Sequence, residues 1–156
     1  MNRIEVLRTY IDEVLLNMND VQERRHGYVH LYGVAQASAL IAIKRGQDAE
    51  LATMTGMLHD IYSYANMDMK DHAHKGAVLT REILESLRIT NDDETEIICN
   101  AIYTHSDKEA VHSDFNEVLK DADIFQQCLY NPIIEIQAPE RKKRFDSLKR
   151  EFGIVK

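Results

Sequence analysis

The chain has 156 residues, 44% of them hydrophobic and 29% charged, which suits a globular protein with one buried core. Its formal net charge of −7 argues against a nucleic-acid polymer as partner, because such proteins present a basic stripe. Cys99 and Cys128 follow no disulfide spacing, the N-terminal segment lacks an apolar signal core, and no later run approaches membrane-spanning length. We therefore expect a cytoplasmic protein that does not bind a membrane.

Helical periodicity runs along the chain, and the alternating β-branched runs that indicate strands are absent. Residues suited to begin a helix precede most of the periodic segments: Asn19 or Asp20, Asp48, Asp71, Ser113 or Asp114, and Pro139. The expected helices cover about residues 4–16, 20–44, 48–58, 72–87, 92–105, 114–130 and 139–151. The sequence thus predicts an all-α fold, a single-domain bundle of about seven helices over residues 1–156. Its core lies at about 20–130, and the C-terminal helix 139–151 packs on that core.

Ligand-type side chains interrupt apolar helix faces at several points. His59 and Asp60 end the apolar run of "TGMLHDI", His30 shares a helical stripe with apolar residues, and Asp123 lies within "KDADIF". A lone histidine on such a face is usually a core residue bonded to a backbone carbonyl, and a lone aspartate is usually solvated. Burying all four together is costly unless they share a cation, and divalent transition metals accept mixed imidazole and carboxylate ligands. His105 also follows an apolar stripe on its helix.

These residues, in this order, resemble the HD superfamily of metal-dependent phosphohydrolases. The resemblance runs from about His26 to Tyr130 and rests on "HGYVHLYGVAQASALIA", "TGMLHDI" and "DADIF". It implies four metal ligands, with Asp121 as the competing candidate in the last motif: His30, His59, Asp60 and Asp123.

Two further segments, "DHAHKGAVLTREIL" and "NAIYTHSD", resemble parts of small bacterial HD proteins that hold two metals, among them a di-iron dinucleoside tetraphosphate hydrolase. The resemblance implies His72 and His105 as additional ligands, with Asp60 bridging the two ions. The alternatives are a solvent-exposed helix start for His72 and a cation at a helix C-terminus for His105. His74 is expected to point elsewhere on its helix.

The resemblance implies hydrolysis of a small phosphate ester or anhydride, with a nucleotide or dinucleotide favoured, by attack of a metal-activated water. The cofactor would be one or two divalent transition-metal ions, either Fe, Mn, Zn, Co or Ni, with Mg less favoured. Asp60 would orient the nucleophile, and Lys75 would offset phosphate charge in catalysis and binding, together with Arg25 and His26. An exposed basic edge is the alternative for the residues around Arg25.

Two other functions remain open at this point. Di-iron HD oxygenases use the same kinds of ligand, and a catalytically silent HD module could bind a nucleotide without turnover. The segment "YSYANMDMKD" is expected to be a loop, in which Tyr62, Tyr64 and Met67 could line a pocket. His112 is expected at the surface, and a homodimer is possible because the C-terminal segment could pack on a second copy.

Overall fold

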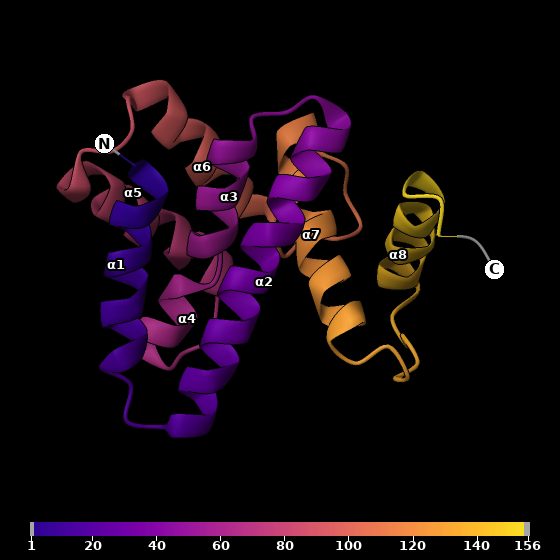
Figure 1. Ribbon diagram of the computed structural model, residues 1–156, viewed down its shortest axis with the longest axis horizontal. Coiled ribbons are helices and arrows are strands. Elements are labelled where there is room, and N and C mark those ends of the chain that lie inside the picture. Colours follow the sequence, from indigo (N-terminus) through magenta and orange to yellow (C-terminus); the bar gives the residue numbers. More distant parts are fainter. Residues whose placement is uncertain (1, 155–156) are drawn as a thin grey trace.

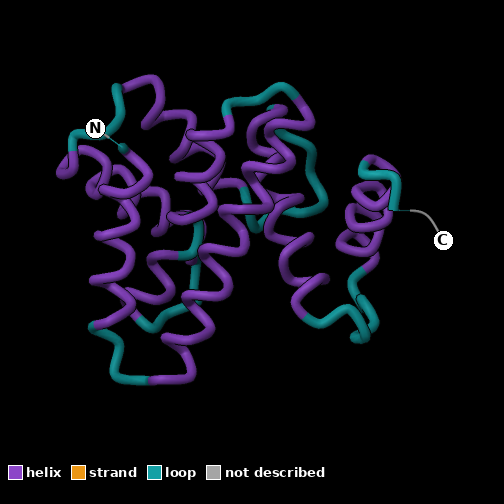
Figure 2. The backbone as a smooth tube through the Cα atoms, viewed as in Figure 1, coloured by secondary structure: helices purple, strands orange, loops and turns teal. Residues whose placement is uncertain are grey.

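Helices account for the regular structure of the protein, in a computed structural model that describes residues 2–154 (Figure 1). Met1, Val155 and Lys156, the ends of the predicted domain, lie outside the described residues. Within residues 2–154 there is no strand, as Figure 2 shows, so the all-α prediction is confirmed. The seven predicted helices are present, and a short one is added: α1 (Arg3–Leu16), α2 (Val21–Arg45), α3 (Ala49–Leu58), α4 (Ile61–Asn66), α5 (His72–Leu87), α6 (Asp92–Thr104), α7 (Asp114–Tyr130) and α8 (Pro139–Glu151).

Side-chain caps fix where most of these helices begin. Asp20 accepts hydrogen bonds from the first backbone N–H groups of α2, Asp48 does so for α3, and Ser113 for α7. Asn91 and Glu94 form a reciprocal capping box at the start of α6. These caps satisfy backbone donors that have no partner within the helix, and they agree with the predicted helix starts.

The segment after the His-Asp pair differs from the prediction. Residues 61–66 form α4 rather than a loop, because Ile61 and Tyr64 are buried and the Asp60 carbonyl accepts the first helical hydrogen bonds. The predicted cap at Asp71 is also wrong. This residue has a left-handed backbone (φ 56°), and its carboxylate contacts His74 instead of capping α5.

Helix α2 is the central element and packs most extensively against α3 and α7 (Figure 1). The contact with α3 is close at Gly56, where an added Cβ would lie 2.6 Å from the Ala35 Cα. A glycine is therefore required there, three residues before His59, for α2 and α3 to approach each other. The core combines the inner faces of most helices: Leu7, Ile11, Leu15, Leu31, Val34, Ile41, Met54, Met57, Leu58, Ile61, Ile98 and Ile102.

Helix α8 lies at the opposite end of the molecule from α1 and contacts α7 (Figure 1). Leu148 is its one fully buried side chain within the described part of the chain. Phe145 also packs on Phe125 of α7, and charged contacts add to this, since Arg144 pairs with Glu117 and Arg45 pairs with Glu151. Within residues 2–154, no helix has both the length and the apolar composition needed to cross a bilayer.

Candidate metal centre

The His-Asp pair lies at the junction of α3 and α4. His59 follows the last residue of α3, and Asp60 precedes the first residue of α4. The change of direction between the helices presents both side chains to the same region, which α2 and α7 also border. His59 is fully buried and Asp60 largely so, which places two polar groups inside the apolar core.

The first cluster consists of His30 from α2, His59, Asp60, and Asp123 from α7. The Nε2 atoms of His30 and His59 are 3.1 Å apart, and each lies 3.3–3.4 Å from the Asp60 Oδ2. The Asp123 Oδ1 is 3.6 Å from the His30 Nε2 and 3.9 Å from the His59 Nε2. Donors at about 2.0–2.2 Å from one transition-metal ion lie roughly 3–4 Å from one another at bond angles of about 90–130°, so these distances suit a ligand set.

The second cluster consists of Asp60, His72 from α5, and His105 after α6. The Asp60 Oδ1 lies 3.4 Å from the His72 Nε2 and 3.3 Å from the His105 Nε2. The two Nε2 atoms are 3.3 Å apart. Asp60 therefore directs one oxygen to each cluster, and the three donors of the second cluster are as closely spaced as those of the first.

Each of the four imidazoles is oriented through its Nδ1 atom. His59, His72 and His105 donate to the carbonyls of Gly56, Met69 and Ile102, each three residues upstream, at 2.7–3.2 Å. The His30 Nδ1 bonds to the Oε1 of Gln126 on α7, at 2.9 Å. With Nδ1 protonated, every Nε2 carries a lone pair that faces the clusters, which is the tautomer that binds a metal.

Two observations test whether a cation fits between these groups. The Asp60 Oδ1 is buried and has no hydrogen-bond partner within residues 2–154, although a buried carboxylate oxygen rarely lacks one. The facing Nε2 atoms, 3.1 Å and 3.3 Å apart, present lone pairs to each other, which is unfavourable without a positive charge between them. A divalent ion in each cluster would satisfy all of these atoms, so the residues present fit the metal ions.

The electrostatics keep the carboxylates ionised. Burial raises the pKa of the Asp60 carboxyl, but the neighbouring imidazoles outweigh it and hold this pKa well below its usual range. Burial acts in the same way on the pKa of Asp123, and the Lys108 ammonium and His59 outweigh it. Burial lowers the pKa of His105. Burial also lowers the pKa of His59, but the Asp60 and Asp123 carboxylates reverse this and leave it raised.

Other residues considered as ligands lie outside the two clusters. Asp121 pairs with Arg45 and Arg144, so Asp123 is the aspartate of "DADIF" that reaches the site. His74 stacks on Tyr103 instead, with ring centroids 4.1 Å apart. His112, which we expected at the surface, is half-buried and contacts the buried Lys120.

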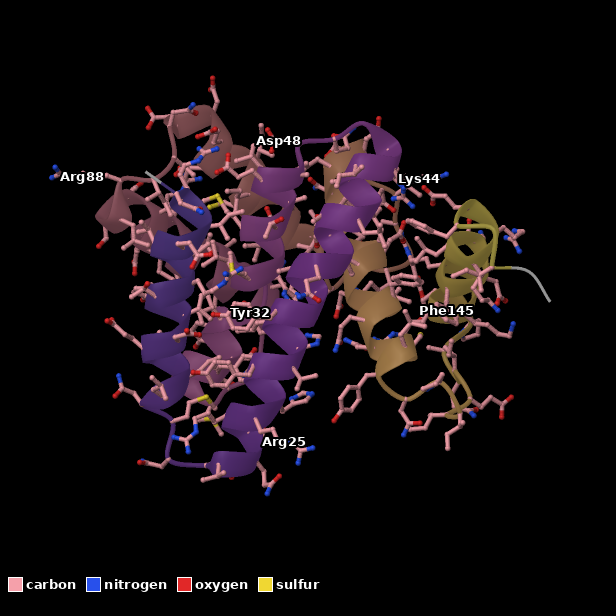
Figure 3. The ribbon with its side chains drawn as sticks, viewed as in Figure 1. Arg25, Tyr32, Lys44, Asp48, Arg88 and Phe145 are labelled. Carbon is pink, nitrogen blue, oxygen red and sulfur yellow. The ribbon has the colours of Figure 1, made fainter. Side chains whose placement is uncertain are left out.

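The expected phosphate-binding residues are distributed differently. Lys75 bonds to Asp68 at 3.0 Å and lies over the Tyr62 ring, so its ammonium contacts these side chains and not a donor of either cluster. Arg25 is exposed near the N-terminal end of α2, and Figure 3 shows it at the edge of the molecule. The structure therefore does not bring Lys75 or Arg25 to the site. His26 does lie beside it, with its ring stacked on that of His30 at 5.8 Å.

Lys108 is a site residue that the sequence did not indicate. Its Nζ lies 2.7 Å from the Asp123 Oδ2, on the oxygen not directed to the first cluster. The carbonyl of Lys108 accepts a hydrogen bond from Arg144 of α8. Lys108 lies three residues after His105, which is the only indication that the sequence offers. Its pairing with Asp123 depends on the path of the loop between α6 and α7.

A cavity of about 480 Å³ opens beside the first cluster, with His30 and Asp60 in its wall. His26 and Tyr64 border the same space, and the Tyr64 hydroxyl is 3.2 Å from the His26 Nδ1. Of the three residues predicted as possible lining residues, Tyr64 and Met67 are in the wall and Tyr62 is not. His30 and Asp60 of the first cluster are therefore reachable by a small molecule.

Comparisons with known proteins agree with this geometry. The HD domain family matches residues 27–127, which is more than half of the chain and contains all six residues of the two clusters. The chain belongs to the HD domain family, whose members bind divalent metals and act as metal-dependent hydrolases.

One solved structure is similar over almost the whole chain. It is a predicted HD superfamily hydrolase from an uncultured Thermotogales bacterium, with 21% identity and a TM-score of 0.58. The alignment covers 97% of this chain and 87% of that one, and at this identity it supports the fold alone. Among curated protein sequences, no significant match was found.

Proposed function

We propose that this protein hydrolyses a small phosphate ester or anhydride, with a nucleotide as the favoured substrate, using one or two divalent transition-metal ions. The observation that carries the proposal is the Asp60 carboxylate, which directs one oxygen to each cluster. Paired metal ions are a recurring arrangement in enzymes that displace an oxygen at phosphorus. Membership of a family of metal-dependent hydrolases supports hydrolysis as the reaction class.

The ions, when bound, supply Lewis acidity that activates a water and polarises a phosphoryl oxygen. His30, His59 and Asp123 would hold one ion, His72 and His105 the other, and Asp60 both. The Nδ1 hydrogen bonds keep the four imidazoles in the tautomer needed for this. Three protein ligands in the second cluster leave room for water and substrate, as in catalytic metal sites.

Lys108 takes the role that we expected for Lys75. Its ammonium holds one Asp123 oxygen and so orients the other toward the first cluster. It also adds a positive charge beside a site where a phosphate would bind, which lowers the cost of placing that anion near three carboxylate oxygens. Mixed imidazole and carboxylate donors favour Fe, Mn, Zn, Co or Ni over Mg, which prefers oxygen ligands.

Elemental analysis of the purified protein, combined with phosphate-release assays on a panel of nucleotides and sugar phosphates, tests the proposal. We expect one to two ions per chain and phosphate release with Mn²⁺, Co²⁺, Ni²⁺ or Fe²⁺. A chelator should abolish the release, and added metal should restore it. A protein that binds no metal and releases no phosphate would contradict the proposal, and nucleotide binding alone would indicate a silent module. Iron-dependent oxygen consumption on a polyol or phosphonate would favour the oxygenase alternative.

A further inference from the structure

The cavity beside the first cluster has a wall of mixed chemistry that bears on the substrate. One part is apolar and partly solvent-exposed, formed by Val29, Met67, Met69 and Tyr130. Apolar side chains around the mouth of a cavity favour an organic group over bare phosphate. The molecule bound there should therefore carry an organic group next to its phosphate.

The charged part of the wall is acidic. Glu23 and Asp68 both line the cavity, and no lysine or arginine does so among the described residues. Lys75 pairs with Asp68 and offsets part of its charge, whereas no cationic side chain of residues 2–154 pairs with Glu23. Sites that bind di- or triphosphates need cations along the phosphate chain. This wall supplies the opposite charge.

Lys108 does not add positive charge inside the cavity. It reaches Asp123 from a separate depression, which it lines together with Lys143 and Arg144. Positive charge for an anion is therefore confined to the metal-binding end. Each further phosphate would place another negative charge beside the carboxylates of this wall. Each such pair of negative charges would lower the affinity on the order of a few-fold.

Ser63 provides an unused hydrogen-bonding group in the same wall. It lies on α4, three residues after Asp60, and its Oγ is buried without a partner in the described part of the chain. A buried hydroxyl without a partner is unusual and is satisfied when a ligand supplies one. A hydroxyl or amide on the organic part of the substrate would do so.

We infer that the cavity selects a phosphate monoester of an uncharged or cationic alcohol over di- and triphosphates. This inference rests on the proposed function and names its substrate class. The carbon body lies along the apolar wall, Ser63 bonds to it, and Glu23 and Asp68 disfavour additional phosphates. In the reaction the water oxygen bonds to phosphorus, the ester P–O bond breaks, and the alcohol leaves with a proton as inorganic phosphate forms.

The test compares kcat/KM for a nucleoside 5′-monophosphate, its triphosphate and phosphoethanolamine, with Mn²⁺ in excess over nucleotide. We expect both monoesters to exceed the triphosphate by at least about tenfold. Glu23→Lys should raise the triphosphate-to-monophosphate ratio about tenfold. Glu13→Lys, the same charge change on an exposed residue of α1, should keep that ratio within about twofold of wild type.

Ser63→Ala should raise KM for the nucleoside monophosphate by about three- to tenfold, the usual effect of one lost hydrogen bond. Ser38→Ala is the matched control, because its Oγ is also buried without a partner but lies against Gly56 between α2 and α3. Equal or better use of the triphosphate by the wild type would overturn the substrate class alone. Release of phosphate from none of these three compounds, nor from any member of the panel of nucleotides and sugar phosphates, would overturn the proposed function as well.

Discussion

The two clusters share Asp60 but differ in how completely the protein encloses them. The first has four donor groups, whose side chains are 0–14% exposed, contributed by α2, the α3–α4 junction and α7. The second has three, and the His72 side chain is 21% exposed at the start of α5. Four protein donors suit a tightly held ion, whereas three suit an ion that exchanges more readily and has positions free for other ligands. The first cluster is therefore the more enclosed of the two, and the second cluster is the more open.

The largest effect is expected at the residue that both clusters share. Asp60→Ala removes an oxygen from each, so we expect both ions to be lost and phosphate release to fall by roughly a factor of 10³ or more. Metal analysis and a phosphate-release assay on the same preparation would measure this. Retention of two ions per chain would show that Asp60 does not bridge the clusters.

Loss of a donor from the first cluster should come next. We expect His30→Ala and Asp123→Ala to lose the tightly held ion and roughly 10²- to 10³-fold in activity, with a largely folded protein. Circular dichroism would check the fold, and elemental analysis the metal content. Turnover by either variant at the wild-type rate would remove that residue from the ligand set.

Changes in the second cluster should separate the two ions. His72→Ala and His105→Ala should lower the stoichiometry from two ions to one and reduce activity by roughly 10²-fold. His74→Ala, two residues from His72 and stacked on Tyr103, is the matched control and should keep both ions. A ratio that did not change in the His72 and His105 variants would leave only the four-donor cluster as a metal site.

Lys108 and Lys75 allow a comparison between a lysine at the site and one beside it. Lys108→Ala removes the hydrogen bond to the Asp123 Oδ2, and such outer contacts typically contribute 10- to 100-fold to activity or metal affinity. Lys75→Ala should change kcat/KM for the nucleoside monophosphate by no more than about twofold, because its ammonium bonds to Asp68 and not to a donor of either cluster. Steady-state kinetics at saturating metal would distinguish them, and equal losses would argue against the role assigned to Lys108.

The effect of metal removal on stability should be modest and should come in two stages, although the same removal abolishes phosphate release. A chelator titration is expected to take the ion of the second cluster first, with little change in the melting temperature. Removal of the other ion should lower the melting temperature by several degrees, because a ligand that binds only the folded state stabilises it. Melting curves recorded at one and at zero ions per chain would test this. A larger drop in melting temperature on removal of the first ion would contradict the expectation that the more enclosed ion is removed last.

The grouping of these residues could be predicted because each lies on a helix or next to a helix end, and most follow an apolar stripe that can be identified from the sequence. Helical spacing located His30 and Asp123, the HD motif order grouped them with His59 and Asp60, and the structure brings all four together. The second cluster also follows the resemblance, since His72 and His105 both reach the Asp60 Oδ1.

What could not be predicted depends on loops and on short elements. Helix α4 has only six residues and no side-chain cap, so its periodicity is too short to separate from a loop. Lys75 was assigned from its closeness to His72 in sequence, yet its side chain is directed to Asp68. Lys108 is distant from Asp123 in sequence, and only the path of the loop between α6 and α7 brings them into contact.

The carbonyls that hold three of the imidazoles have a consequence for motion. Gly56 of α3 and Ile102 of α6 each lie one helical turn upstream of the histidine they orient, so the bond moves with its ring when that helix shifts as a rigid unit, whereas Met69 lies in the loop just before α5. Relative motion of the helices then changes the distances between the donors without rotating the His59 and His105 rings. His30 is different, because its partner Gln126 belongs to α7. Sliding of α2 along α7 would therefore rotate this ring and weaken the binding of an ion in the first cluster.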